Sequence, residues 1–205
     1  PALSDKIRSR CPNVRRVALE ALSVVEPAAL AEHAALVVKA ARYDSYIDVK
    51  EAALATLRKL EPATLAPHAT DVAECLRHFD EDVREAALIP LRRLEPVELA
   101  RHAPIVCCML TDEWMEDSDG SVPTEGLLLL GQLEPATLAE YDFVIRQILP
   151  HPNEHVRRLA LVTLGKLEPA VIAESAKALL GRLVDSDWEV RNRALQTLGM
   201  MKPAK

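Results

Sequence analysis

The chain has 205 residues, 49% hydrophobic and 27% charged, which is typical of a soluble folded protein. With 3% aromatic residues and 6 glycines it is too poor in both for a β-sandwich or barrel, and its net charge of −6 argues against a general grip on nucleic acid. No apolar run approaches the ~20 residues of a membrane span. The 4 cysteines have no zinc-type spacing, so we expect buried, reduced thiols and a cytoplasmic location.

A repeat runs through the whole chain. Prolines recur at spacings of 35, 34, 39, 34 and 34 residues, five of them after glutamate and the last after lysine. We call them the repeat prolines: Pro27, Pro62, Pro96, Pro135, Pro169 and Pro203. A valine stands thirteen residues before each one, and these repeat valines are Val14, Val49, Val83, Val122, Val156 and Val190. Two positions held in register over six copies define one structural unit.

Each copy predicts two helices. In the second copy the first helix is expected over about 49–60, with apolar positions three and four residues apart. Polar residues three positions before the repeat valine suit helix N-caps: Asp80, Asp119, Asn153 and Asp187. The Glu-Pro pair then breaks the chain, and a second helix is expected over about 62–79.

Stacked copies would bury stripes that one copy cannot bury alone. The sequence therefore predicts an all-α fold, a right-handed α-solenoid of about five to six two-helix repeats. We expect a single domain over 1–205, with repeats at 11–45, 46–79, 80–118, 119–152 and 153–186 and a partial one at 187–205. Neither end shows a polar capping repeat, so the chain is expected to be a fragment of a longer array or to self-associate through its ends.

The segment Asp187-Trp188-Glu189-Val190-Arg191, followed by Ala194-Leu195 and Leu198-Gly199, resembles the HEAT repeat family, in particular its short, armadillo-like branch. Asp82-Val83-Arg84 and His155-Val156-Arg157 fit the same pattern. The resemblance covers essentially the whole chain. It implies that the second helices line a concave surface where a protein or peptide partner binds.

A histidine ladder is the clearest candidate for recognition. His33, His68 and His102 stand six residues after their repeat prolines, and Tyr141 takes that place in the fourth copy. One residue per repeat is too widely spaced for a metal site, so we predict no metal. The ladder is either structural or part of a partner surface. The neighbouring positions on the same flank of the second helix complete the predicted strip: Ile105, Met109 and Val144.

The fourth copy is irregular. About five extra residues around Trp114 explain the 39-residue spacing, and an exposed tryptophan there would suit a recognition anchor, with sequence drift as the alternative. Asp117-Ser118-Asp119-Gly120 is reminiscent of a calcium loop, but it aligns with the ordinary turn at 185–188 and lacks the final glutamate.

Basic residues directly follow the repeat valines: Arg15, Lys50, Arg84, Arg157 and Arg191. They could bind phosphates, as in HEAT-like DNA glycosylases, but bonds to nearby acids such as Asp48, Asp82 and Glu189, or to turn carbonyls, explain them better. No catalytic constellation is evident, so we predict a non-enzymatic scaffold without cofactor, nucleic acid or membrane. The family resemblance leaves one alternative, a HEAT-like bilin (phycobilisome) lyase or chromophore chaperone.

Overall fold

The computed structural model describes residues 2–111 and 120–201, and all regular structure in these two ranges is helical. The chain divides into two compact units, Pro1–Val106 and Cys107–Lys205, which are described separately below. No helix within the described ranges is long and apolar enough to cross a membrane.

In unit 1 each repeat proline starts a short helix, which is followed by a second helix and then by the first helix of the next copy. The helices are α1 (Ala2–Ile7), α2 (Pro12–Leu22), α3 (Pro27–Ala31), α4 (Ala34–Tyr43), α5 (Ile47–Leu57), α6 (Pro62–Leu65), η1 (Ala66–His68), α7 (Ala69–Glu74), η2 (Cys75–Arg77), α8 (Glu81–Leu91) and α9 (Pro96–Ala100). Helix α10 (Ala103–Thr111) spans the boundary between the units.

Unit 2 repeats the same order. Its helices are α11 (Ser121–Leu130), α12 (Pro135–Ala139), α13 (Asp142–Ile148), α14 (Glu154–Leu164), α15 (Pro169–Glu174), α16 (Ala176–Arg182) and α17 (Trp188–Gly199).

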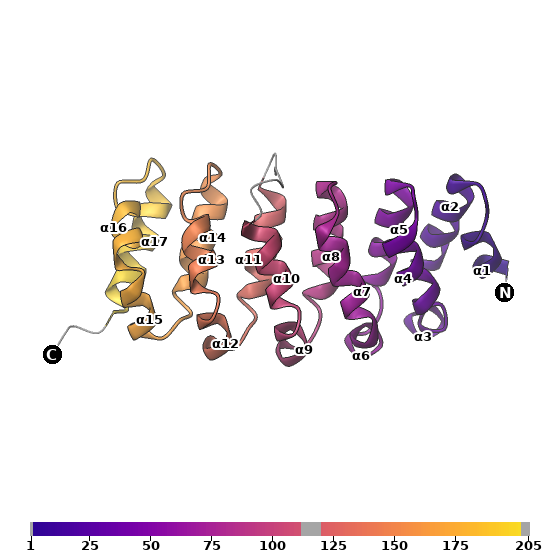
Figure 1. Ribbon diagram of the computed structural model, residues 1–205, viewed down its shortest axis with the longest axis horizontal. Helices are drawn as coiled ribbons and strands as arrows, with labels where there is room; N and C mark the ends of the chain where they lie inside the picture. The colour runs from indigo at the N-terminus through magenta and orange to yellow at the C-terminus, as the bar shows by residue number, and fades with distance from the viewer. Residues whose placement is uncertain (1, 112–119, 202–205) are drawn as a thin grey trace. The chain divides into compact units, whose positions relative to one another are not determined.

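Each unit has two layers of helices. In unit 1 the first helices of the repeats, α2, α5 and α8, pack side by side, and α1, α4 and α7 pack against them as a second layer. In unit 2, α11, α14 and α17 stack in the same way, with α13 on α14 and α16 on α17. Figure 1 shows the short helices at the repeat prolines along one edge of each unit.

The repeated apolar positions form the core. Leu57 and Leu91, both on first helices, are fully buried, as are Leu65 and Leu99 on the short segments. Because these side chains are removed from water, each helix is held by burial of its apolar stripe and not by its own hydrogen bonds alone. The predicted interior is therefore confirmed.

Three of the predicted N-caps of the first helices are confirmed, although α5 begins at Ile47 and not at the predicted residue 49. The side chains of Asp80 and Asn153 accept hydrogen bonds from backbone N–H groups of the first turn, and Asp187 accepts one from Val190. Asp119 lies outside the described residues. The helices end earlier than predicted, since α5 stops at Leu57, although Leu60 in the following turn is still buried.

The prediction of one continuous second helix over 62–79 is wrong. The segment is broken into α6, η1, α7 and η2, and the break before α7 falls at His68, where φ is −105° and ψ is −2°. His33 and Tyr141 have nearly the same backbone angles. These angles lie outside the helical minimum. Because the chain bends at this residue, the short helix can bury its leucine while the axis of the next helix runs in a different direction.

Candidate partner-binding surfaces

Three residues of the histidine ladder, His33, His68 and Tyr141, lie at this helix break with half-buried side chains. His33 on unit 1 lies with its Nδ1 3.2 Å from the Ser4 hydroxyl of α1, so the ring bridges two second-layer helices. His68 is half-buried as well. In unit 2, Tyr141 is half-buried, and burial raises the pKa of its phenol. The His33 ring therefore lies in the seam between α1 and α4.

Three other residues of the predicted strip lie in the core. His102 is buried, and its Nε2 lies 4.0 Å from a Glu98 carboxylate oxygen. Burial lowers the pKa of this imidazole despite the nearby carboxylate. Met109 and Val144 are also buried, whereas Ile105 keeps partial exposure. The structure thus leaves only part of the predicted strip accessible, and Trp114 lies outside the described residues.

Two of the basic residues after the repeat valines, Arg15 and Arg157, tie a first helix to the turn that precedes the next first helix, a contact that we call a clip. In unit 1, Arg15 donates from Nε and Nη2 to the two carboxylate oxygens of Asp44, at 2.7 and 2.8 Å. Its Nη1 donates to the carbonyls of Ser9 and Arg10. Burial opposes ionisation of Asp44, but the bonds from Arg15 and from the Tyr46 N–H outweigh it and lower the pKa.

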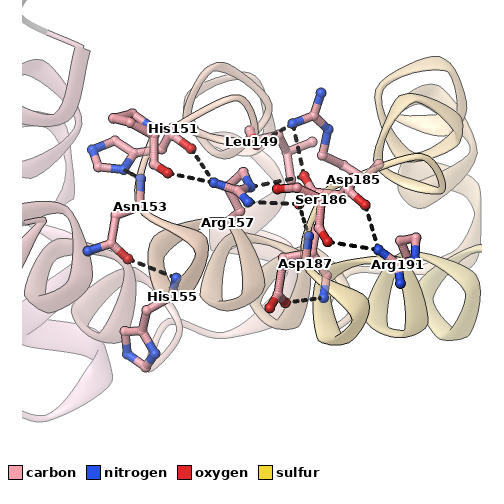
Figure 2. A network of polar contacts seen from close by, with 12 residues as sticks. Leu149, His151, Asn153, His155, Arg157, Asp185, Ser186, Asp187 and Arg191 are labelled. Carbon is pink, nitrogen blue, oxygen red and sulfur yellow. Dashed lines mark hydrogen bonds and ion pairs between the residues drawn. The ribbon is translucent and has the colours of Figure 1, made fainter.

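The same clip recurs in unit 2, as Figure 2 shows. Arg157 binds Asp185 through Nε and Nη2 at 2.9 and 2.7 Å, while its Nη1 donates to the carbonyls of His151 and Pro152. The pKa of Asp185 is lowered too, because the hydrogen bonds from Arg157 and the Asp187 N–H overcome its burial.

The structural interpretation of this basic row is supported, but the acids differ from those predicted. The two-armed clips use Asp44 and Asp185, which stand five residues before a repeat valine. Lys50 donates to carbonyls at the C-terminal end of α4, and Arg191 donates to carbonyls of the turn before α17. Glu189 pairs instead with Arg158.

Open hollows lie between neighbouring first helices. In unit 1 a hollow of about 530 Å³ separates α2 from α5, with Asn13, Arg16 and Glu20 on one side and Asp48 and Glu51 on the other. Its lining is strongly charged. A shallow, mixed-charge hollow of this kind suits an extended polypeptide better than a small apolar ligand, which needs an enclosed pocket.

Unit 2 has a matching hollow of about 280 Å³ between α14 and α17. His155 and Arg158 line it from α14, while Trp188 and Asn192 line it from α17. Trp188 is 62% exposed, unusual for so large an aromatic side chain. Its indole and the amide of Asn192 stand one helical turn apart on the same side of α17.

The two hollows use equivalent positions of the repeat. The residue just before the repeat valine and the residue two places after it contribute in both helices of each pair: Asn13, Arg16, Asp48, Glu51, His155, Arg158, Glu189 and Asn192. The repeat valine and the leucine five residues after it are the same in all six copies, whereas these surface positions change from copy to copy. This variation at fixed positions of the repeat is visible in the sequence, but the strip predicted on the second helices does not include these positions.

One acidic group borders the unit 1 hollow. Oxygens of Glu51, Asp80 and Asp82 lie within 4.8 Å of one another, the single such group of potential metal ligands within residues 2–111 and 120–201. Burial, followed by the charges of Asp82, Asp48 and Asp80, raises the pKa of Glu51. Asp80 already serves as a helix N-cap, so the group has an explanation without a cation.

Comparison with known proteins supports the fold. Residues 141–205 match the family model of HEAT repeats. An engineered protein solved by the Northeast Structural Genomics Consortium superposes with a TM-score of 0.71 at 16% identity, covering 97% of this chain and 94% of its own. Computationally designed armadillo repeat proteins for modular peptide recognition give 0.75 at 14% identity, covering 98% and 99%. No curated protein matches the sequence.

These matches confirm the predicted resemblance to HEAT and armadillo-type repeats and the all-α solenoid class. At 16% and 14% identity, the two solved structures support the fold and nothing beyond it. They lend no support to the bilin lyase alternative.

Proposed function

We propose that this α-solenoid of HEAT-type repeats is a binding scaffold rather than an enzyme, and that its partner is an extended segment of another protein lying across the first helices. One observation carries the proposal: hollows occur at equivalent positions of α2/α5 and of α14/α17, lined by residues that vary, while the valine and leucine positions of the core stay constant. When a regular backbone presents different surface side chains in each repeat, successive repeats can contact successive residues of an extended polypeptide.

The burial of side chains favours the first helices over the second helices as the binding face. The sequence favoured the second helices, but His102, Met109 and Val144 are buried there. On the first helices, Trp188 and Asn192 stand open to solvent beside Arg158. Exposed tryptophan and arginine are the side chains that most often dominate binding energies. A solved relative in fold, the designed armadillo repeat protein, is described as serving peptide recognition.

Selection from a library of random peptides displayed on phage tests the proposal. We expect enriched peptides whose affinity falls at least about tenfold, or about 1.4 kcal/mol, in the double variant Trp188→Ala/Asn192→Ala. Phe79→Ala is the matched control, since it also removes an exposed aromatic ring but lies in neither hollow.

A second pair of variants addresses the ladder. His68→Glu and Tyr141→Ala change half-buried residues of the second helices, and we expect the selected peptides to bind both as tightly as the unchanged chain. Loss of binding in these variants, with no loss in the Trp188/Asn192 variant, would move the site to the second helices. Failure to enrich any peptide would count against the scaffold proposal itself.

A further inference from the structure

The charge of the first-helix surface differs between the two units. It is carried by two positions that line the hollows, the residue just before the repeat valine and the residue two places after it. On α14 of unit 2 these positions hold His155 and Arg158. On α5 and α8 of unit 1 they hold carboxylates only, namely Asp48, Glu51, Asp82 and Glu85. Two successive copies of unit 1 therefore present negative charge at the same place.

The four carboxylates lack a counter-charge. No ion pair joins any of them to a cation within residues 2–111 and 120–201. The cations next to them in sequence are buried, since Lys50 donates to carbonyls at the end of α4 and Arg84 donates to carbonyls of the turn before α8. Arg58 and Lys59 line the opposite end of the unit 1 hollow, about 10 Å or two helical turns beyond Glu51. The negative charge is thus open to a partner that crosses α5 and α8.

Like charges meet where α5 and α8 pack together. One oxygen each of Glu51, Asp80 and Asp82 lies within 4.8 Å of the others. Burial raises the pKa of Glu51, and the charges of Asp82, Asp48 and Asp80 raise it further. The N-cap role accounts for Asp80 alone. Because the other carboxylates repel one another, a positive side chain beside them would relieve this repulsion as well as being attracted itself.

The electrostatic preference of helix ends does not explain the pattern. Negative side chains are favourable near any helix N-terminus. The same two positions nevertheless hold His155 and Arg158 on α14, and Asn13 and Arg16 on α2, where Arg16 pairs with Glu20 of its own helix. Among the first helices of the described residues, acids at both positions are found on α5 and α8 alone.

We propose that the segment bound across α5 and α8 of unit 1 is basic, with lysine or arginine side chains facing these four carboxylates. This inference rests on the proposed function, since it takes the partner to be an extended segment lying across the first helices. Neighbouring packed helices lie about 8–10 Å apart, and three residues of an extended chain span about 10 Å. A positive side chain at every third residue would therefore meet one acidic pair in each copy.

Fluorescence anisotropy at low ionic strength tests this with two labelled peptides. The lysine probe is a short glycine-serine chain with lysine at every third position, and the glutamate probe has glutamate there instead. We expect the lysine probe to bind and the glutamate probe not to bind. The double variant Asp48→Asn/Asp82→Asn should weaken binding of the lysine probe about fivefold, as expected for the loss of two exposed ion pairs.

A matched variant separates this site from attraction to the net charge of the chain. Glu32→Gln/Glu61→Gln also removes two exposed carboxylates of unit 1, but these lie outside the first helices, so affinity should change less than about twofold. Circular dichroism should show unchanged helix content in both double variants, because all four side chains are exposed.

Three results would overturn the proposal: equal weakening in the two double variants, a lysine probe that does not bind, or a glutamate probe that binds as tightly. Each is distinct from failure of the proposed function, which is measured with random peptides and depends on Trp188 and Asn192 of unit 2. Peptides that require Trp188 and Asn192, together with a lysine probe that does not bind, would leave the scaffold and remove its preference for a basic segment.

Discussion

The Arg157–Asp185 pair in unit 2 joins two side chains that are 9% and 3% exposed. Burying two charges is costly, and here the cost is offset by four directed hydrogen bonds from one guanidinium. The Arg15–Asp44 pair repeats the arrangement in unit 1. These residues fix where one first helix begins relative to the next, so their role is structural.

Replacement of Asp185 should show this in the pH dependence of stability. The folded-state pKa of Asp185 lies below its ordinary value of 3.8, so its stabilising effect is complete above that pH and is lost as pH falls through the lower, folded value. We expect Asp185→Asn to lower the free energy of unfolding at pH 7 by about 1–3 kcal/mol. The variant should also lose less stability than the unchanged chain between pH 4 and pH 2.

Urea unfolding at a series of pH values provides the measurement. Glu140→Gln is the control, because this carboxylate is exposed and its removal should change stability by less than about 0.5 kcal/mol. Equal pH profiles for Asp185→Asn and the unchanged chain would contradict a stabilising role for the clip.

At the level of elements, the backbone conformation at the start of a helix limits which residue types are tolerated there. Gly120 precedes α11 with φ of 85°, the single residue with positive φ within the described ranges. A methyl group there would also lie 3.0 Å from side-chain atoms of Asn153 and Val156. The turn into α11 therefore requires glycine for both backbone and packing reasons.

Two glycine substitutions should have opposite effects. Gly120→Ala should lower the free energy of unfolding by about 1–2 kcal/mol, because alanine is strained at positive φ. Gly181→Ala should raise it by about 0.5–1 kcal/mol, since Gly181 lies within α16 and nothing approaches its added methyl group within 4 Å. Urea unfolding with unchanged slope would report both. A stabilising Gly120→Ala would show that the turn can relax.

At the level of the whole molecule, the environment of a repeat position depends on its neighbours and not on its residue type. Leu161 on α14 and Leu195 on α17 occupy the same place in two copies, yet one is fully buried and the other is 61% exposed. The stability of an array is close to a sum over repeats and the contacts between them.

The two leucines should therefore respond differently to the same substitution. Leu161→Ala should cost about 2–5 kcal/mol, as expected for a buried leucine. Leu195→Ala should cost less than about 0.5 kcal/mol, because most of this side chain is already exposed to water. Thermal and urea unfolding of both variants would check this. Similar losses for both would show that repeat position, and not neighbour contact, sets the cost.

The repeat, the all-α class, most of the core and most helix N-caps could be predicted from the amino-acid sequence. These follow from local signals, namely the spacing of valine, alanine and leucine, the caps at Asp80, Asn153 and Asp187, and the prolines that interrupt each copy. They need no knowledge of which residues meet across the fold.

Which flank of each repeat is exposed to solvent follows from the packing of the helices and could not be predicted from the sequence. His102, Met109 and Val144 have helical spacing that fits either a core or a groove, and packing against neighbouring helices buried them. The break at His33, His68 and Tyr141, the partners of Arg15 and Arg157, and the hollow beside Trp188 likewise depend on contacts between distant segments. Periodicity identifies the side of a helix that avoids water, but the exposure of its flanks depends on the distance to the next helix.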